Sequence, residues 1–161
     1  MRPHQLFAAM EPQQARALFD ALKEKAPLAW AQAIGLTAGA LKARPQFVQK
    51  QPPERRAEWV RKALARVKSD PVAEEMLAVY FLECRNGLLV DWLDRIGVEH
   101  DKGTLQGEPA EPPAEKLREA VEAFRKAAAD EADAADRELL LRAFAAQSSI
   151  DWPALDALLA S

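Results

Sequence analysis

The chain has 161 residues, of which 49% are hydrophobic, enough to bury the core of one medium-sized domain. Its single cysteine excludes an internal disulfide and any zinc site built from several thiolates. The longest apolar runs, such as "GLLV" at 87–90, are far shorter than the roughly 20 residues of a membrane-spanning helix, and the N-terminal apolar patch is too short for a secretory signal. We therefore expect a cytoplasmic protein that does not enter a membrane.

The net charge of −3 conceals two halves of opposite sign. Residues 1–68 carry 13 Lys and Arg against 5 Asp and Glu, and residues 69–161 carry 9 against 20, so the halves have net charges of +8 and −11. Such asymmetry points to a polyanionic partner or to an oppositely charged docking surface. The alternative is that the two halves simply pack against each other.

The first half of the chain shows the three-to-four-residue spacing of amphipathic helices. A helix is predicted over 11–25, where a proline suited to the first turn precedes an apolar face. A second helix is predicted over 27–35, with Gly35 as its end. A third is predicted over 52–68.

The second half continues the same pattern. A helix is predicted to begin at Asp70 as N-cap, followed by Pro71, with an apolar stripe that reaches Cys84. Further helices are predicted over 86–97, 112–130, 135–147 and 148–161. No segment alternates with the period of a strand, so we expect an all-α fold, a compact array or bundle of about seven to eight helices forming a single domain over residues 1–161.

The helices also suggest an internal duplication at an offset of about 62 residues. The matching positions are Phe19, Trp30, Ile34 and Gly35 in one copy and Phe81, Trp92, Ile96 and Gly97 in the other. We therefore expect degenerate three-helix repeat units over 52–97 and 112–160 and a partial unit over 1–35. The connectors at about 35–52 and 97–112, marked by proline and glycine, are predicted to be loops. The second connector is long enough to be either functional or merely mobile.

The residue types that most often act in catalysis or metal binding are expected to have structural roles in this chain. Cys84 lies on the apolar stripe of its predicted helix, where a free cysteine behaves as a small hydrophobic residue. His100 and Asp101 lie in a polar loop without the further ligands that a metal requires, and His4 is expected to be a solvated terminal residue. Asp91 and Arg95 have the spacing of a surface ion pair on a helix. No nucleotide-binding or catalytic motif is found, so we expect no enzyme, no cofactor and no metal site.

The best candidate for a binding surface is the helix predicted over 52–68. At 100° per residue Arg55, Lys62 and Arg66 share one outward face, which Trp59 borders. The neighbouring cations Lys42, Arg44, Lys50 and Arg56 extend this face into a basic patch with aromatic interleaving. The simpler interpretation is a solvated polar helix face.

These observations predict a non-catalytic helical protein-interaction module with an unidentified protein partner. The alternative is that the basic first half binds nucleic acid or another polyanion.

Overall fold

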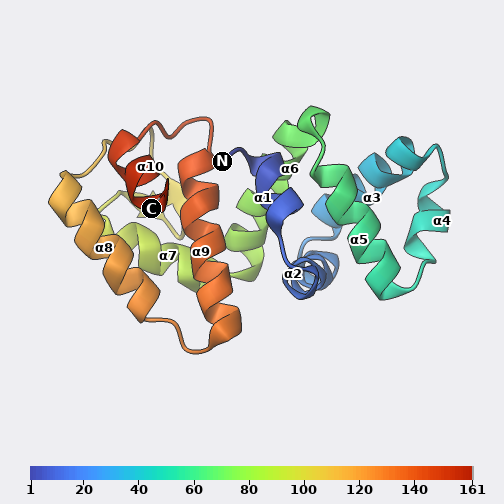
Figure 1. Ribbon diagram of the computed structural model, residues 1–161, viewed down its shortest axis with the longest axis horizontal. Coiled ribbons are helices and arrows are strands. Elements are labelled where there is room, and N and C mark those ends of the chain that lie inside the picture. Colours follow the sequence, from blue (N-terminus) through green and yellow to red (C-terminus); the bar gives the residue numbers. More distant parts are fainter. Residues whose placement is uncertain (161) are drawn as a thin grey trace. The chain divides into compact units, whose positions relative to one another are not determined.

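The computed structural model describes residues 1–160 and divides the chain into two compact units, Met1–Cys84 and Arg85–Ser161. Helices dominate both units (Figure 1). Strands within the described residues amount to one antiparallel pair of two residues each. The predicted all-α class is therefore confirmed.

Proline defines where the helices of the first unit begin. The unit contains α1 (Pro3–Ala9), α2 (Pro12–Lys25), α3 (Pro27–Leu41), α4 (Pro45–Gln49), α5 (Pro53–Leu64), the 3₁₀ helix η1 (Val67–Ser69), α6 (Asp70–Val79) and the π-helix η2 (Tyr80–Cys84). Each helix from α1 to α5 has proline as its first residue. Proline is favoured there because its fixed φ suits the helix and its missing N–H would be unpaired in the first turn anyway.

The core of the first unit forms where α3 packs against α2 and α5. The rings of Phe7 and Phe19 stack with centroids 6.1 Å apart, and the ring of Trp30 lies 5.9 Å from that of Phe19. All three side chains are buried. The short helix α4 packs on α3 and lies at one end of this unit, beyond α3 and α5 (Figure 1).

His4 is buried against Asp70, so the prediction of a solvated terminal histidine is wrong. Its Nδ1 lies 2.6 Å from the Asp70 carboxylate, and its backbone N–H donates to the same oxygen at 3.1 Å. Arg2 donates to the other carboxylate oxygen at 2.5 Å. Asp70 is the first residue of α6 rather than its N-cap, and its side chain ties α1 to α6.

The second unit has its own aromatic core. It consists of α7 (Asn86–Arg95), β1 (His100–Asp101), β2 (Thr104–Leu105), α8 (Ala114–Lys126), α9 (Glu131–Ala146) and α10 (Pro153–Ala160). Trp92 on α7 is fully buried, with its ring 5.4 Å from that of Phe124 and 5.8 Å from that of Phe144. The Asp130 side chain caps α9 by accepting from the backbone N–H of Asp133.

Both predicted loops contain regular structure. Gly35 does not end its helix: α3 continues to Leu41 and ends at Lys42, which adopts the left-handed conformation at φ 54°. The rest of the 35–52 connector includes α4, which is too short to show a periodic pattern. The 97–112 connector contains the β1–β2 hairpin, in which His100 pairs with Leu105.

The predicted internal repeat is not confirmed. The boundary between the compact units follows Cys84 and therefore falls inside the expected 52–97 repeat unit. This boundary separates α5 and α6 from α7, three helices that the duplication assigned to one unit. The single domain expected over residues 1–161 stays a prediction.

Candidate functional site

The candidate residues of the 52–68 segment lie on α5 and just beyond its end. Arg55 and Lys62 are exposed and Trp59 is half-buried, as expected for one outward face of a helix. Arg66 is also exposed, but it lies after the end of α5, in the turn before η1. The helical periodicity that predicted its place beside Arg55 and Lys62 therefore does not extend to Arg66.

Phe47 completes this face, and sequence reasoning missed it because it was assigned to a loop. Its ring stacks on that of Trp59 with centroids 5.9 Å apart and planes 26° apart, and its side chain is 52% exposed. Val48, next to it on α4, is fully buried, which anchors the short helix. Gln51 donates a side-chain hydrogen bond to the Phe47 carbonyl at 3.1 Å. The sequence signal that could have revealed α4 is Pro45 at the first helical position.

Two cations of the connector flank Phe47 directly. Arg44 is the N-cap residue of α4 and Lys50 is its C-cap residue, so they lie at opposite ends of the turn that presents Phe47. Along the chain each of these two cations is three residues from Phe47, and both are exposed. Lys42, at the C-cap of α3, is exposed as well. We define the basic–aromatic surface as Arg44, Phe47, Lys50, Arg55, Trp59, Lys62 and Arg66.

Other cations of this segment have structural roles instead. The Arg56 guanidinium lies 5.6 Å from the centre of the Trp30 ring and donates to the Gln49 carbonyl at 3.0 Å. Arg61 donates to the Glu58 carboxylate at 2.6 Å and to the Phe7 carbonyl at 3.0 Å. The hydrogen bond from Arg61 lowers the pKa of Glu58, and the same bond raises the pKa of Arg61. Arg56 therefore does not belong to the basic–aromatic surface.

The positive charge of this surface is largely uncompensated within the first unit. Only two carboxylates, Glu54 and Glu58, occur between residues 42 and 68. Glu54 lies 3.2 Å from Arg16, and Glu58 is bound by Arg61, with Lys62 further away at 3.9 Å. Arg55 makes a long contact of 3.4 Å with Gln51, which is neutral. The surface thus has cations available to an acidic ligand.

Apolar exposure is concentrated in the same unit. The exposed large hydrophobic residues of the described chain are Met1, Leu28, Leu41, Phe47 and Val67, all within residues 1–84. Leu28 is 88% exposed at the start of α3, a helix without a single charged residue. A helix that is apolar on all sides is usually buried, so one side of α3 lacks a covering element.

The residues first considered for chemistry lie in structural positions. Cys84 is half-buried at the end of η2. A π-helix has more residues per turn than an α-helix, so Cys84 does not align fully with the buried side chains of α6. Burial raises the pKa of its thiol. The backbone N–H of Gly103 donates to Nδ1 of His100, and Nε2 lies 2.7 Å from the Asp94 carboxylate, so the imidazole organises the hairpin. Asp91 and Arg95 form the predicted ion pair at 3.1 Å.

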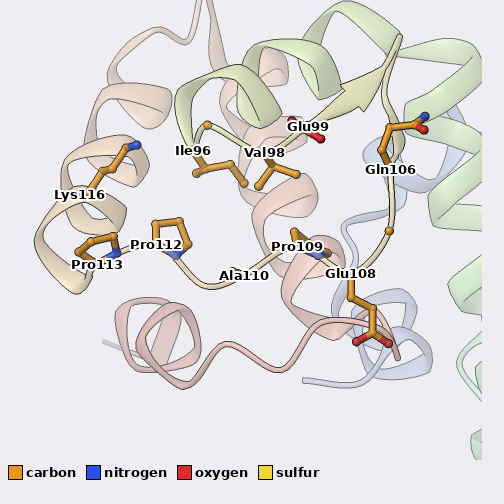
Figure 2. A pocket seen from close by; sticks show the side chains of 12 residues that line it. Ile96, Val98, Glu99, Gln106, Glu108, Pro109, Ala110, Pro112, Pro113 and Lys116 are labelled. Carbon is orange, nitrogen blue, oxygen red and sulfur yellow. The ribbon is translucent and has the colours of Figure 1, made fainter.

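The second unit contains a pocket of about 340 Å³ between the end of α7 and the start of α8. Its walls include Ile96, Val98 and Pro112, and Lys116 of α8 lies at its margin. Figure 2 shows the carboxylates of its two glutamates on opposite sides of the pocket, so they do not form an acid–base pair.

The described residues contain neither a membrane-spanning helix nor a cluster of metal ligands. No helix within residues 1–160 combines the length and apolar character needed to cross a bilayer. In the same part of the chain, no group of three or more His, Cys, Asp or Glu side chains could hold a metal ion. Comparisons with family models, with curated proteins and with solved structures found no match to this chain.

Proposed function

We propose that this chain is a non-catalytic, cytoplasmic protein-interaction module that uses the basic–aromatic surface of its first unit. The observation that carries the proposal is the stacked and partly exposed Phe47–Trp59 pair on a segment with nine Lys and Arg against two Glu, of whose surface cations only Lys62 pairs with one of those glutamates. Aromatic residues and arginine are enriched at the energetic centres of protein interfaces, because they bury large areas and form directed polar contacts. Phe47 would supply the apolar centre and Arg44 and Arg55 the polar contacts.

Nucleic-acid binding is the second candidate function, and the same surface supports it. Proteins that bind single strands combine basic grooves with aromatic side chains on which bases stack. Against this candidate, the second unit has 9 Lys and Arg and 16 Asp and Glu, a net charge of −7, which repels a long polyanion at low ionic strength. The first unit is only moderately basic, with 13 against 9.

Affinity capture from a cell extract, with and without nuclease, separates the two candidates. The bait is the full chain, and the test variant is Phe47→Gln, which removes the exposed ring. Leu28→Gln is the matched control, because Leu28 is even more exposed but belongs to α3. We expect protein partners that resist nuclease, that are lost with Phe47→Gln and that are kept with Leu28→Gln.

Three results would contradict the proposal. Partners that disappear after nuclease treatment would favour the nucleic-acid candidate. Partners that are lost only with Leu28→Gln would place the interface on α3. Absence of any specific partner would leave the basic–aromatic surface a solvated face.

A further inference from the structure

We propose that the ligand of the basic–aromatic surface is an acidic protein segment with an apolar anchor residue. This inference rests on the proposed interaction function and identifies the chemistry of the partner. Three features of the first unit lead to it, namely the charge of the surface, the kind of apolar side chain beside it and the geometry of the aromatic pair.

Charge complementarity requires an acidic ligand. Between residues 42 and 68 nine Lys and Arg face two Glu in the sequence. Both glutamates are already paired, Glu54 with Arg16 and Glu58 with Arg61. Arg44, Lys50 and Arg66 are exposed, and a ligand carboxylate could approach them without displacing an internal ion pair.

The apolar neighbours favour a protein ligand over a nucleic acid. Leu41, which precedes Lys42 in the sequence, is 46% exposed, and Val67, which follows Arg66, is 74% exposed. Aliphatic side chains of a peptide can cover such groups, whereas a sugar-phosphate backbone offers no comparable apolar surface. Exposed apolar and cationic side chains thus occur together in this unit. We therefore expect the ligand to be a peptide segment in which carboxylates alternate with apolar residues.

The geometry of the aromatic pair also favours a peptide ligand over a nucleic acid. Phe47 and Trp59 stack on each other, so the ring faces that oppose each other are occupied, and Trp59 is half-buried. Bases that stack in succession along a strand need free ring faces. The exposed side of Phe47 instead offers one contact, suited to a single apolar side chain of the ligand.

Titration with defined probes tests this inference. The probes are a short glutamate-rich peptide with a central Leu-Phe pair, the same peptide with serines in place of that pair, and an oligothymidylate of equal charge. Tryptophan fluorescence reports the binding, because Trp59 is half-buried while Trp30, Trp92 and Trp152 are buried. Trp59→Phe should abolish the change in emission.

Matched charge variants locate the binding site. The test variant is Lys50→Gln/Arg55→Gln/Lys62→Gln, and the control is Lys102→Gln/Lys116→Gln/Lys126→Gln, which removes the same charge from exposed positions of the second unit. We expect the test variant to bind the anchored peptide about tenfold more weakly, because exposed ion pairs are individually weak, and the control to bind unchanged. Phe47→Ala should remove the preference for the anchored peptide over the serine peptide.

The outcomes distinguish this inference from the proposed function. Tighter binding of oligothymidylate than of the anchored peptide, equal affinity of the two peptides, or equal weakening by both triple variants would each overturn the inference. If the peptides fail while protein partners that resist nuclease are still captured through Phe47, the interaction function stands and its ligand is not acidic. If neither experiment detects binding, both proposals fail.

Discussion

Asp70 connects the N-terminal helix to the rest of the first unit through three hydrogen bonds. Burial of the carboxylate acts to raise the pKa of Asp70, but the bonds from the His4 side chain, the His4 backbone and Arg2 outweigh it, so the pKa lies below its ordinary value. A depressed pKa means that the native state favours the charged form. The stabilisation is therefore complete above the pKa of the unfolded chain and is lost as the pH falls through the native pKa.

Replacing Asp70 with Asn should lower the free energy of unfolding at neutral pH by roughly 2 to 3 kcal/mol, because charge-assisted bonds to Arg2 and His4 are lost. Denaturant unfolding over a pH series measures the difference, which should begin to shrink below about pH 4, where Asp70 of the unfolded chain takes up a proton, and should vanish as the pH falls through the lower pKa of the native carboxylate. Asp20→Asn is the control: Asp20 is exposed and 3.9 Å from Arg16, so its loss should change stability by less than about 1 kcal/mol. A difference for Asp70→Asn that is independent of pH would contradict this account.

Cys84 should react slowly in the folded protein. Its thiol is half-buried and burial raises its pKa, so less of the reactive thiolate is present near pH 8 than in an unfolded chain. We expect alkylation by iodoacetamide to be several times slower than in denaturant and to accelerate more steeply with pH. Labelling at the rate of the unfolded chain would show that Cys84 is accessible and that its thiol is not perturbed.

Single residues also show what sequence reasoning could reach. The Asp91–Arg95 pair follows from helical spacing, which is a local rule, and the structure contains it. The burial of His4 depends on Asp70, 66 residues away, and no local pattern specifies such a contact. Phe47 was missed for a related reason, since its stacking partner lies on another helix.

At the scale of elements, the starts of the helices predicted in the first unit were easier to predict than their ends, whereas α9 begins at Glu131 and α10 at Pro153 rather than at the predicted 135 and 148. Proline marks the first residue of α2, α3 and α5, and its fixed φ makes that signal local. Gly35 looked like an end because glycine commonly terminates helices, yet α3 passes through it and ends at Lys42. Lys42 adopts the left-handed conformation there, and the backbone N–H of Ala43 donates to the Ala38 carbonyl at 2.9 Å, so local hydrogen bonds end the helix at a residue type that rarely adopts this conformation.

The two glycines inside α3 offer a test of this interpretation. A Cβ at Gly35 or Gly39 would meet no atom within 4 Å, so alanine fits at either position. Gly35→Ala and Gly39→Ala should each stabilise the protein by about 0.5 to 1 kcal/mol, since alanine loses less backbone entropy in a helix. Thermal or denaturant unfolding measures the change.

Gly97→Ala is the matched control and should have the opposite sign. Gly97 has a φ of 70°, which is unfavourable for alanine, and its added Cβ would lie 3.2 Å from the Lys116 ammonium nitrogen. If Gly35→Ala and Gly39→Ala destabilise the protein instead, the added methyl groups must meet atoms other than those of the described residues.

At the scale of the whole molecule, each compact unit has its own aromatic core. The first is built around Phe7, Phe19 and Trp30, and the second around Trp92, Phe124 and Phe144. A chain cut after Cys84 should therefore give two fragments that each retain helical circular dichroism and a cooperative, though lower, melting transition. A fragment without a cooperative transition would show that its core depends on the rest of the chain.

The predicted repeat kept α5, α6 and α7 in one unit, whereas the structure divides the chain after Cys84. Repeat matching compares residue types at a fixed offset, but a compact unit is defined by the helices that share a core.

The opposite charges of the two units predict how separate copies of the chain behave. The first unit has 13 Lys and Arg against 9 Asp and Glu, and the second has 9 against 16, so the units carry +4 and −7. Within the described residues the second unit exposes no large hydrophobic side chain, so its attraction to the basic–aromatic surface of another copy would be purely electrostatic. Sedimentation velocity should therefore detect weak association that depends on concentration near 0.01 M salt, where the Debye length is about 30 Å, and none near 0.15 M, where it is about 8 Å.

Lys50→Gln/Arg55→Gln/Lys62→Gln should reduce the association at low salt more than the matched control in the second unit does. An oligomer that persists at high salt would instead indicate an apolar interface, and the uncovered side of α3 around Leu28 would then be the first surface to mutate.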